Sequence, residues 1–144
     1  MTRLTDHFTL EELTVTNTGI DNTPTAIHRA QLEITAMQME KVRSALGNRP
    51  IKVTSGYRNP KVNKAVGGVP TSAHAKAYAV DFHVPGLTLD QIMAAISHKF
   101  SGVLFDQLIK ETSRNVIHIS FDPRLRRQVL EQAKGPGTPV VPWK

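Results

Sequence analysis

The chain has 144 residues, 40% of them hydrophobic, and this size and composition predict one globular domain with a single core. It contains no cysteine, so disulfides and thiolate metal sites are excluded, and any metal ion would need His, Asp or Glu ligands. Lys and Arg number 18 against 12 Asp and Glu, a net charge of +6 that favours a polyanionic partner such as nucleic acid, an anionic membrane surface or a cell wall.

The distribution of apolar and basic residues narrows the location and the partners. No apolar run approaches the roughly 20 residues that span a bilayer, and the opening MTRLTDHFTLEEL lacks the apolar core of a secretory signal. We therefore expect synthesis in a cytoplasm without a signal peptide, and a monomer with no membrane span. The basic residues are scattered apart from Arg124, Arg126 and Arg127, without the interleaved aromatic side chains of single-strand binders, so no specific nucleic-acid partner is expected.

The chain contains signals for both helices and strands. The expected helices are a short one opened by Thr9 and Glu12, a long one from Pro24 to Gly47, a brief one after Asn59-Pro60 through about Ala65, one opened by Thr88 and Gln91, and a last one from Asp122-Pro123 through about Ala133. The expected strands are 51–54, 77–84, 103–111 and 116–121. These elements predict a small single α+β domain over residues 1–134, with an antiparallel sheet flanked by helices. A Pro/Gly-rich tail, 135–144, has no periodic pattern, and we expect it to hang loose or to lie over the surface.

Three candidate metal ligands fall at the edges of these elements. His74 lies just before a predicted strand, Asp81 lies within it, and His118 lies on the last strand. Two imidazoles and one carboxylate suit zinc, and three protein ligands leave the fourth position open, as in catalytic sites. A single buried histidine is more often a core residue bonded to backbone, and His83 shares a strand face with Asp81, which makes it a rival ligand. Spacing alone leaves these readings open.

A longer pattern resembles the peptidase M15 family, whose members include D-Ala-D-Ala carboxypeptidases and phage endolysins that cut cell-wall peptides. The resemblance spans roughly residues 7–121, and the opening HFTLEELT and the string GIDNTP are similar to its phage and prophage branch. The matching positions are Ser55 to Arg58, Asn63, Val66 to Gly68, Ser72, His74, Ala79, Asp81 and His118-Ile-Ser120.

The resemblance implies an α+β fold of the D-Ala-D-Ala carboxypeptidase and hedgehog type, with zinc held at the sheet edge by His74, Asp81 and His118. It implies that Arg58 polarises the scissile carbonyl and stabilises the charge of the tetrahedral intermediate, although a surface salt bridge is the plainer reading of an arginine. Ser72 would donate a hydrogen bond to the substrate or the site loop, or would be a turn residue.

The implied substrate is the stem peptide of peptidoglycan. The implied role is that of a phage or prophage endolysin-type endopeptidase, made in the host cytoplasm and acting on the cell wall in the periplasm after release. A net positive charge would help such an enzyme find an anionic wall. A D-Ala-D-Ala carboxypeptidase and an inactive wall-binding relative are the alternatives.

Two positions depart from the family pattern. Ala77 stands where glycine is usual, which is tolerable if the residue has a negative φ and no backbone passes close by. Asn115 stands where many relatives carry the acid that serves as general base, and an amide cannot accept a proton. If strands 103–111 and 116–121 form a hairpin with an even-length loop, Glu111 projects from the same face as His118 and can replace that acid.

A two-residue loop at 114–115 would make Glu111 and His118 direct opposites. A solvent-facing glutamate at a hairpin end is the alternative reading of Glu111. Asp106 has the opposite parity to Glu111 in the same strand, so we expect it to be structural or to orient a ligand histidine.

Overall fold

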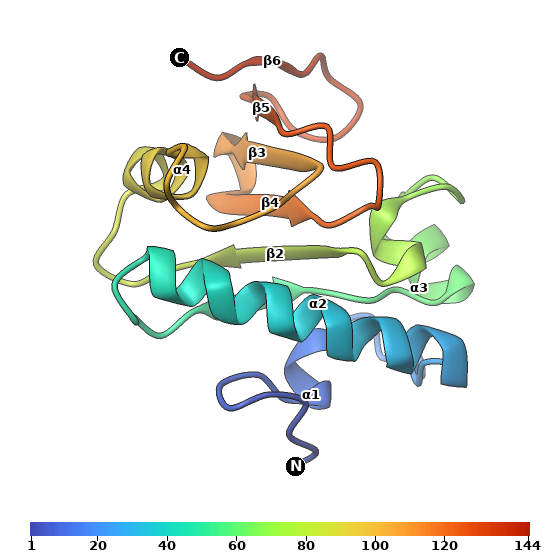
Figure 1. Cartoon of the computed structure of the whole chain (residues 1–144). Helices are drawn as coiled ribbons and strands as arrows, with labels where there is room; N and C mark the ends of the chain where they lie inside the picture. Colours follow the sequence, from blue (N-terminus) through green and yellow to red (C-terminus); the bar gives the residue numbers. More distant parts are fainter.

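The computed structural model describes all 144 residues, which form a six-stranded sheet with its helices as separate elements around it (Figure 1). The helices are α1 (Leu10–Leu13), α2 (Ala26–Ala45), α3 (Pro60–Ala65) and α4 (Leu89–Ser97), with short 3-10 helices η1 (Ala73–Lys76) and η2 (Thr112–Arg114). The strands are β1 (Lys52–Ser55), β2 (Ala79–His83), β3 (Gln107–Glu111), β4 (Val116–Ser120), β5 (Gln128–Gln132) and β6 (Val141–Pro142).

The sheet has the strand order β1-β2-β4-β3-β5-β6. Its strand pairs are antiparallel except that β5 runs parallel to β3, so the sheet is mixed rather than wholly antiparallel. The helices α2 and α4 lie against one face of the sheet (Figure 1), and the core fills the space between them. The fully buried core side chains include Leu32, Met39, Phe82, Ile92, Met93, Ile96, Leu108 and Ile117.

The two faces of the sheet have different chemistry because successive strand residues point to opposite sides. On β2, Val80 and Phe82 are fully buried in the core cluster, so Asp81 between them projects from the opposite face. The register pairs Asp81 directly with His118 of β4, which places both side chains on that second face. Two of the three candidate ligands, Asp81 and His118, thus lie on interior strands rather than on an edge strand.

The local signals for the first four helix starts are confirmed. Thr9 and Thr88 each form a complete capping box, with Glu12 and with Gln91 respectively. The α2 helix begins two residues after Pro24, with Thr25 as its N-cap. The predicted α+β class and the order of elements as far as β4 therefore agree with the structure.

The predicted helix after Asp122-Pro123 is wrong. Residues 128–132 form the strand β5, and Leu125 and Arg127 before it have positive φ values of 43° and 55°, which no right-handed helix accepts. The buried carboxylate of Asp106 accepts hydrogen bonds from the backbone and the guanidinium of Arg126. This anchor, a contact between distant residues, turns the chain so that it runs along β3.

The C-terminal tail lies against the domain. Residues 141–142 pair with β5, and the indole Nε1 of Trp143 donates a hydrogen bond of 2.9 Å to Asp90 at the start of α4. The Trp143 side chain also packs against the core cluster, and its backbone N–H donates to the carbonyl of Val129. The division into a domain of residues 1–134 and a separate tail stays a prediction. No helix combines the length and the apolar character needed to cross a bilayer.

We expect Trp143→Ala to lower the free energy of unfolding by about 2 kcal/mol, because it removes a partly buried aromatic side chain and its hydrogen bond. Urea denaturation followed by circular dichroism measures the change. Lys144→Ala is the matched control, since Lys144 is exposed, and it should leave the midpoint unchanged. An unchanged midpoint for Trp143→Ala would show that the tail does not stabilise the domain.

Candidate metal centre

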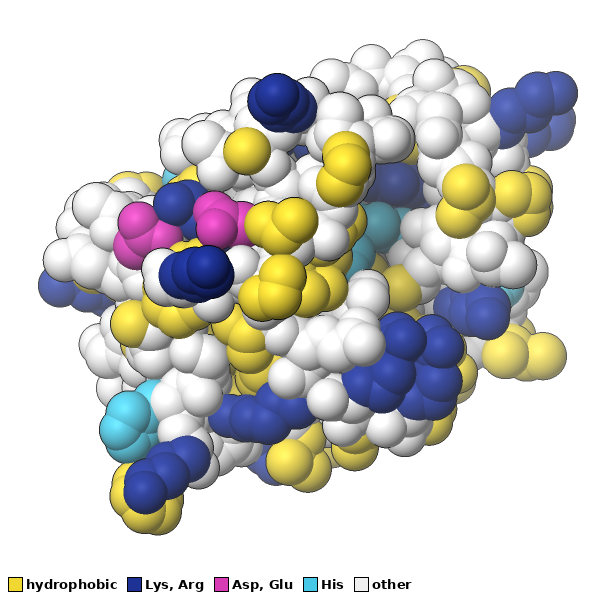
Figure 2. Space-filling model, turned by 90° about the horizontal axis from the view of Figure 1, so that it is seen from above, with side chains coloured by type: hydrophobic (Ala, Val, Ile, Leu, Met, Phe, Trp, Pro, Cys, Tyr) yellow, Lys and Arg dark blue, Asp and Glu magenta, His cyan; other side chains and the backbone are white.

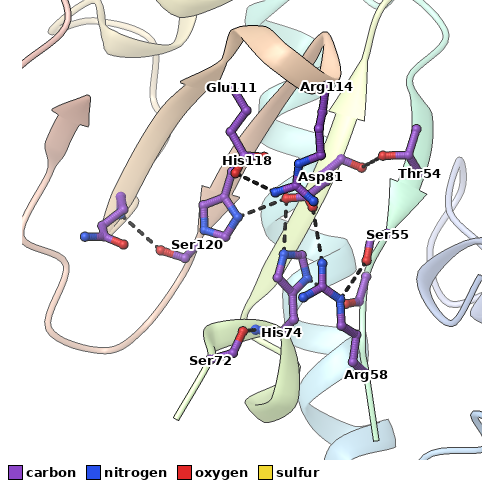
Figure 3. A network of polar contacts seen from close by, with 12 residues as sticks. Thr54, Ser55, Arg58, Ser72, His74, Asp81, Glu111, Arg114, His118 and Ser120 are labelled. Carbon is purple, nitrogen blue, oxygen red and sulfur yellow. Dashed lines mark hydrogen bonds and ion pairs between the residues drawn. The ribbon is translucent and has the colours of Figure 1, made fainter. Parts of the chain in front are cut away.

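The structure brings His74, Asp81 and His118 together from three elements. Their ligand atoms all lie within 4.8 Å of one another, on η1, β2 and β4 respectively (Figure 3). Asp81 Oδ1 lies 3.1 Å from Nε2 of His74 and 2.9 Å from Nδ1 of His118. His83, the rival ligand, is not part of this cluster. The arrangement is a compact set of two imidazoles and one carboxylate on one face of the sheet.

The donor atoms of this cluster fit a cation. Nδ1 of His74 lies 2.8 Å from the carbonyl oxygen of Gly56, which can only accept, so this nitrogen carries the ring proton. In a neutral ring the lone pair of Nε2 then faces Asp81 Oδ1, which is also an acceptor. A metal ion bound by His74, Asp81 and His118 satisfies these lone pairs together, and the Gly56 contact holds the imidazole in the matching tautomer.

Asp81 carries its charge inside the protein, with only 1% of its surface exposed. Burial by itself would raise the pKa of this carboxyl, but His74 and His118 hold the pKa well below its usual range. The second oxygen, Oδ2, lies 3.6 Å from Nη2 of Arg58. Asp81 is therefore ionised and ready to act as a metal ligand near neutral pH.

Arg58 is held beside the cluster in a fixed position. Its side chain is mostly buried, and its Nε donates a hydrogen bond of 3.2 Å to Ser55 Oγ (Figure 3). Burial lowers the pKa of the guanidinium while Asp81 raises it, and an arginine remains charged under either influence. The alternative of an exposed surface salt bridge is excluded, because Arg58 is only 9% exposed.

Hydrogen bonds with Asn22 hold the segment around Arg58 in place, and no sequence motif had pointed to this residue as part of the site. The amide Nδ2 of Asn22 donates to the carbonyls of Thr14 and Tyr57, at 2.9 and 2.7 Å. Its Oδ1 accepts the backbone N–H of Asn59 at 2.9 Å. Asn22 thus fixes the residues on both sides of Arg58. It belongs to the string GIDNTP, whose likeness to one family branch was the only signal available.

Glu111 faces the same side of the sheet as His118, as an even-length loop requires. The loop is four residues long, 112–115, so Glu111 pairs with Val116 and is diagonal to His118, not opposite to it. The expected even length of the loop is therefore found, but the loop is longer than the two residues that would have made Glu111 and His118 direct opposites. Oε1 of Glu111 accepts a 2.7 Å hydrogen bond from Arg114, while Oε2 is buried without a partner. Arg114, which the sequence analysis missed, thereby fixes one carboxylate oxygen and leaves the other free.

Two other predicted residues have structural contacts. Ser72 is the N-cap of η1, and its Oγ accepts the backbone N–H of His74, so it shapes the loop that carries this ligand. Asp106 binds Arg126 and touches no ligand histidine, which favours the structural reading of this residue. Asn115 is exposed at the end of η2 with a φ of 54°, a turn position rather than a place in the cluster.

Ala77 does not meet the condition expected of it, since its φ is +64°. An alanine in this left-handed region carries roughly 1–2 kcal/mol of strain. The methyl group is fully buried in the core cluster, and the carbonyl of Ala77 accepts a hydrogen bond of 2.7 Å from Thr35. Packing and this buried hydrogen bond offset the strain, which explains how alanine replaces the usual glycine here.

The cluster lies between two adjoining hollows. The β3-side hollow, about 290 Å³, includes His74, His118, Glu111 and Gln107 in its lining. The β1-side hollow, about 360 Å³, includes Thr16, Thr54, Ser55 and Asp81. Arg58, Val66 and Arg114 border both hollows. Figure 2 shows histidine side chains recessed in a depression, with Lys and Arg side chains spread over this view and acidic ones gathered toward one end of it.

Comparison with known proteins assigns the family. The profile of the peptidase M15 family matches residues 6–120. The chain belongs to the peptidase M15 family. It is 31% identical over 80 residues to the zinc D-Ala-D-Ala carboxypeptidase of Streptomyces albus G, covering 55% of this chain and 31% of that protein. It is 32% identical over 93 residues to the peptidoglycan L,D-endopeptidase MepK of Escherichia coli K12, covering 60% of this chain and 48% of that protein.

The family resemblance seen in the sequence is thereby confirmed. The chain spans less than half the length of each of these two relatives, so the comparison bears on the M15 domain rather than on the whole of either protein. Both the candidate ligands and Arg58 lie inside the matched residues, whereas β5, β6 and the loop between them lie beyond residue 120.

We expect Asn22→Ala to lower the free energy of unfolding by about 3 kcal/mol, because it leaves buried backbone groups of Thr14, Tyr57 and Asn59 without partners. Chemical denaturation measures this change, and hydrogen exchange at the Asn59 amide should become faster. Asn17→Ala, at an exposed asparagine of the same segment, is the control and should stay within about 0.5 kcal/mol of the native protein. If Asn22→Ala also lowered the free energy of unfolding by no more than about 0.5 kcal/mol, the proposed role of Asn22 in fixing the segment around Arg58 would be contradicted.

Proposed function

We propose that the protein is a zinc-dependent peptidase that hydrolyses a peptide bond within the stem peptide of peptidoglycan. The observation that carries the proposal is the convergence of His74, Asp81 and His118 beside the buried Arg58. The ligand composition, two histidines and one carboxylate with no thiolate, is that of catalytic zinc sites. The relatives named for zinc and for peptidoglycan support the metal and the substrate.

Zinc bound by these three residues would act as a Lewis acid that polarises a carbonyl group and lowers the pKa of water. Arg58 would donate hydrogen bonds to the oxygen that becomes negative as the scissile carbonyl is attacked, and its burial keeps it in place before the reaction begins. Ser72, which also lines the β3-side hollow, has a hydroxyl proton free to donate to the substrate.

Glu111 is the proposed general base. Its Oε2 is buried without a hydrogen-bond partner and it lines the same hollow as His74 and His118. Because Arg114 holds Oε1, the free oxygen can accept the proton of the attacking water and pass it to the departing amine. Asn115 is excluded from this role by its chemistry and by its exposed position.

Cleavage inside a peptide is favoured over removal of the last residue. The two hollows adjoin at Arg58, Val66 and Arg114, and they extend from the ligand cluster in two directions. A substrate chain can therefore continue on both sides of the scissile bond, as an endopeptidase requires. A D-Ala-D-Ala carboxypeptidase, the activity for which one relative is named, is the second candidate.

We also propose the role of a phage or prophage endolysin that reaches the wall after release from the host cytoplasm. The net charge of +6 supports this proposal, because a basic surface favours binding to an anionic wall. The similarity of HFTLEELT and GIDNTP to the phage branch of the family supports it as well. An inactive wall-binding protein remains the competing account and predicts binding without turnover.

Mass spectrometry of muropeptides tests the reaction. Purified peptidoglycan incubated with the zinc-loaded protein should yield fragments with a new amino terminus inside the stem peptide. Release of free D-alanine alone would instead establish the carboxypeptidase, and intact muropeptides bound by the protein would establish the wall-binding alternative. Glu111→Gln keeps the shape of the side chain and removes the base, so turnover should fall by roughly 10²–10⁴-fold.

Asn115→Gly is the control for Glu111→Gln, since glycine accepts the positive φ of this exposed turn position and should retain turnover. Full activity of Glu111→Gln would remove Glu111 from the mechanism. Loss of activity in Asn115→Gly with an intact fold would contradict the view of Asn115 as a turn residue with no part in turnover.

Arg58→Ala should keep zinc and lose roughly 10²–10³-fold in kcat, because it removes one preorganised donor to the oxyanion. Steady-state kinetics together with metal analysis of the same preparation separates the two effects. Arg58→Lys should recover little of the rate, since a single ammonium cannot reproduce the fork that reaches both Ser55 and Asp81. Unchanged kcat in Arg58→Ala would exclude the proposed role.

A further inference from the structure

The residues beyond the family match build one wall of the site. The match ends at residue 120, and β5, the following loop and β6 come after it. Since β5 is the parallel neighbour of β3, it widens the sheet on the side of the β3-side hollow. Gln132 and Pro136 from this added segment line that hollow together with His74 and His118.

The added strand continues the row of side chains that contains the metal ligands. Direct pairing runs from Asp81 to His118, from His118 to Ile109, and from Ile109 to Leu130. Directly paired residues point to the same face of a sheet, so these four side chains form one row across four strands. The ligand end of the row is polar and the far end, Ile109 and Leu130, is apolar.

Amide side chains lie on both sides of this apolar floor. Gln107 and Gln128 are direct partners, and Nε2 of Gln107 donates a hydrogen bond of 2.9 Å to Oε1 of Gln128. This bond leaves one acceptor on Gln107 and the donors of Gln128 free. On the other side of the floor, Gln132 is the direct partner of Glu111. An apolar floor between amides suits an extended peptide with small aliphatic side chains.

The wall is held in place by contacts within the added segment and with η2. Nε2 of Gln132 donates a hydrogen bond of 2.9 Å to the carbonyl of Thr138, which closes the loop after β5. The buried Gly135 lies beside Ser113, since a Cβ built on Gly135 would be 3.3 Å from Ser113 Oγ. Ser113 adjoins Arg114, so the loop packs next to the residue that fixes Glu111.

We infer that β5 and the loop after it form an extended subsite that binds the substrate peptide beyond the residues at the scissile bond. The ligand class is an extended peptide chain with small aliphatic side chains, which lie over Ile109 in the hollow and over Leu130, the next residue of the row outside its lining, while the peptide backbone bonds Gln107 and Gln132. This subsite selects substrates by their length on one side of the scissile bond. The inference rests on the proposed peptidase function and adds to it the part of the substrate that is recognised.

The test is a set of synthetic stem peptides, extended one residue at a time from either end of the cleaved bond, with the zinc-loaded 144-residue chain. Native protein should gain in kcat/KM on extension at one end, and Gln132→Ala should lose about 3- to 10-fold of that gain, as expected for one lost hydrogen bond. Gln132→Met keeps the length of the side chain without its amide and should lose the same gain.

Glu131→Ala is the matched control, because Glu131 neighbours Gln132 in β5 and pairs with Lys110 on the opposite face. It should keep the full gain on extension. Equal gains in native protein and both Gln132 variants would overturn the inference while leaving the peptidase intact. Native protein that shows no gain at either end would overturn it as well. Native protein that cleaves none of the peptides would instead contradict the proposed function on which the inference rests.

Discussion

The structure depends on one buried carboxylate, that of Asp81. Two imidazoles and a guanidinium converge on it, and it has almost no contact with solvent. A buried charge is costly unless several partners compensate it, so the position of Asp81 requires His74, His118 and Arg58 to come together. Since these residues come from four separate segments of the chain, a single electrostatic requirement organises the whole site.

The fold meets this requirement by placing the hydrophobic core and the candidate metal centre on opposite faces of one sheet. The face toward α2 and α4 is filled by apolar side chains, which supply the stability, and the other face carries the polar residues. Gly56 contributes to both the site and the packing. Its carbonyl orients His74, and because it has no side chain, β1 can approach α1. A Cβ there would lie 2.3 Å from the carbonyl oxygen of Leu13, so only glycine fits.

Much of this arrangement could be predicted from sequence, because the signals were local. The capping boxes, the apolar stripes and the ordered family pattern identified the fold class, the family and the residues that meet in the cluster. The failures came from distant contacts. The contact of Asp106 with Arg126 favours the strand β5 where a helix was predicted, and the four-residue loop before Val116 sets the offset between Glu111 and His118. Core packing allows the positive φ of Ala77. Asn22 and Arg114 act through partners that spacing does not reveal.

The other proposals all depend on zinc binding at this metal centre, and the number of zinc ions bound per molecule tests it most directly. The purified protein, saturated with zinc and then dialysed, should hold about one zinc ion per molecule by mass spectrometry. The Asp81→Asn variant, with the same fold, should hold almost none, because an amide is a poor zinc ligand. Native protein that retains no zinc, or an Asp81→Asn protein that keeps a full equivalent, would contradict the account.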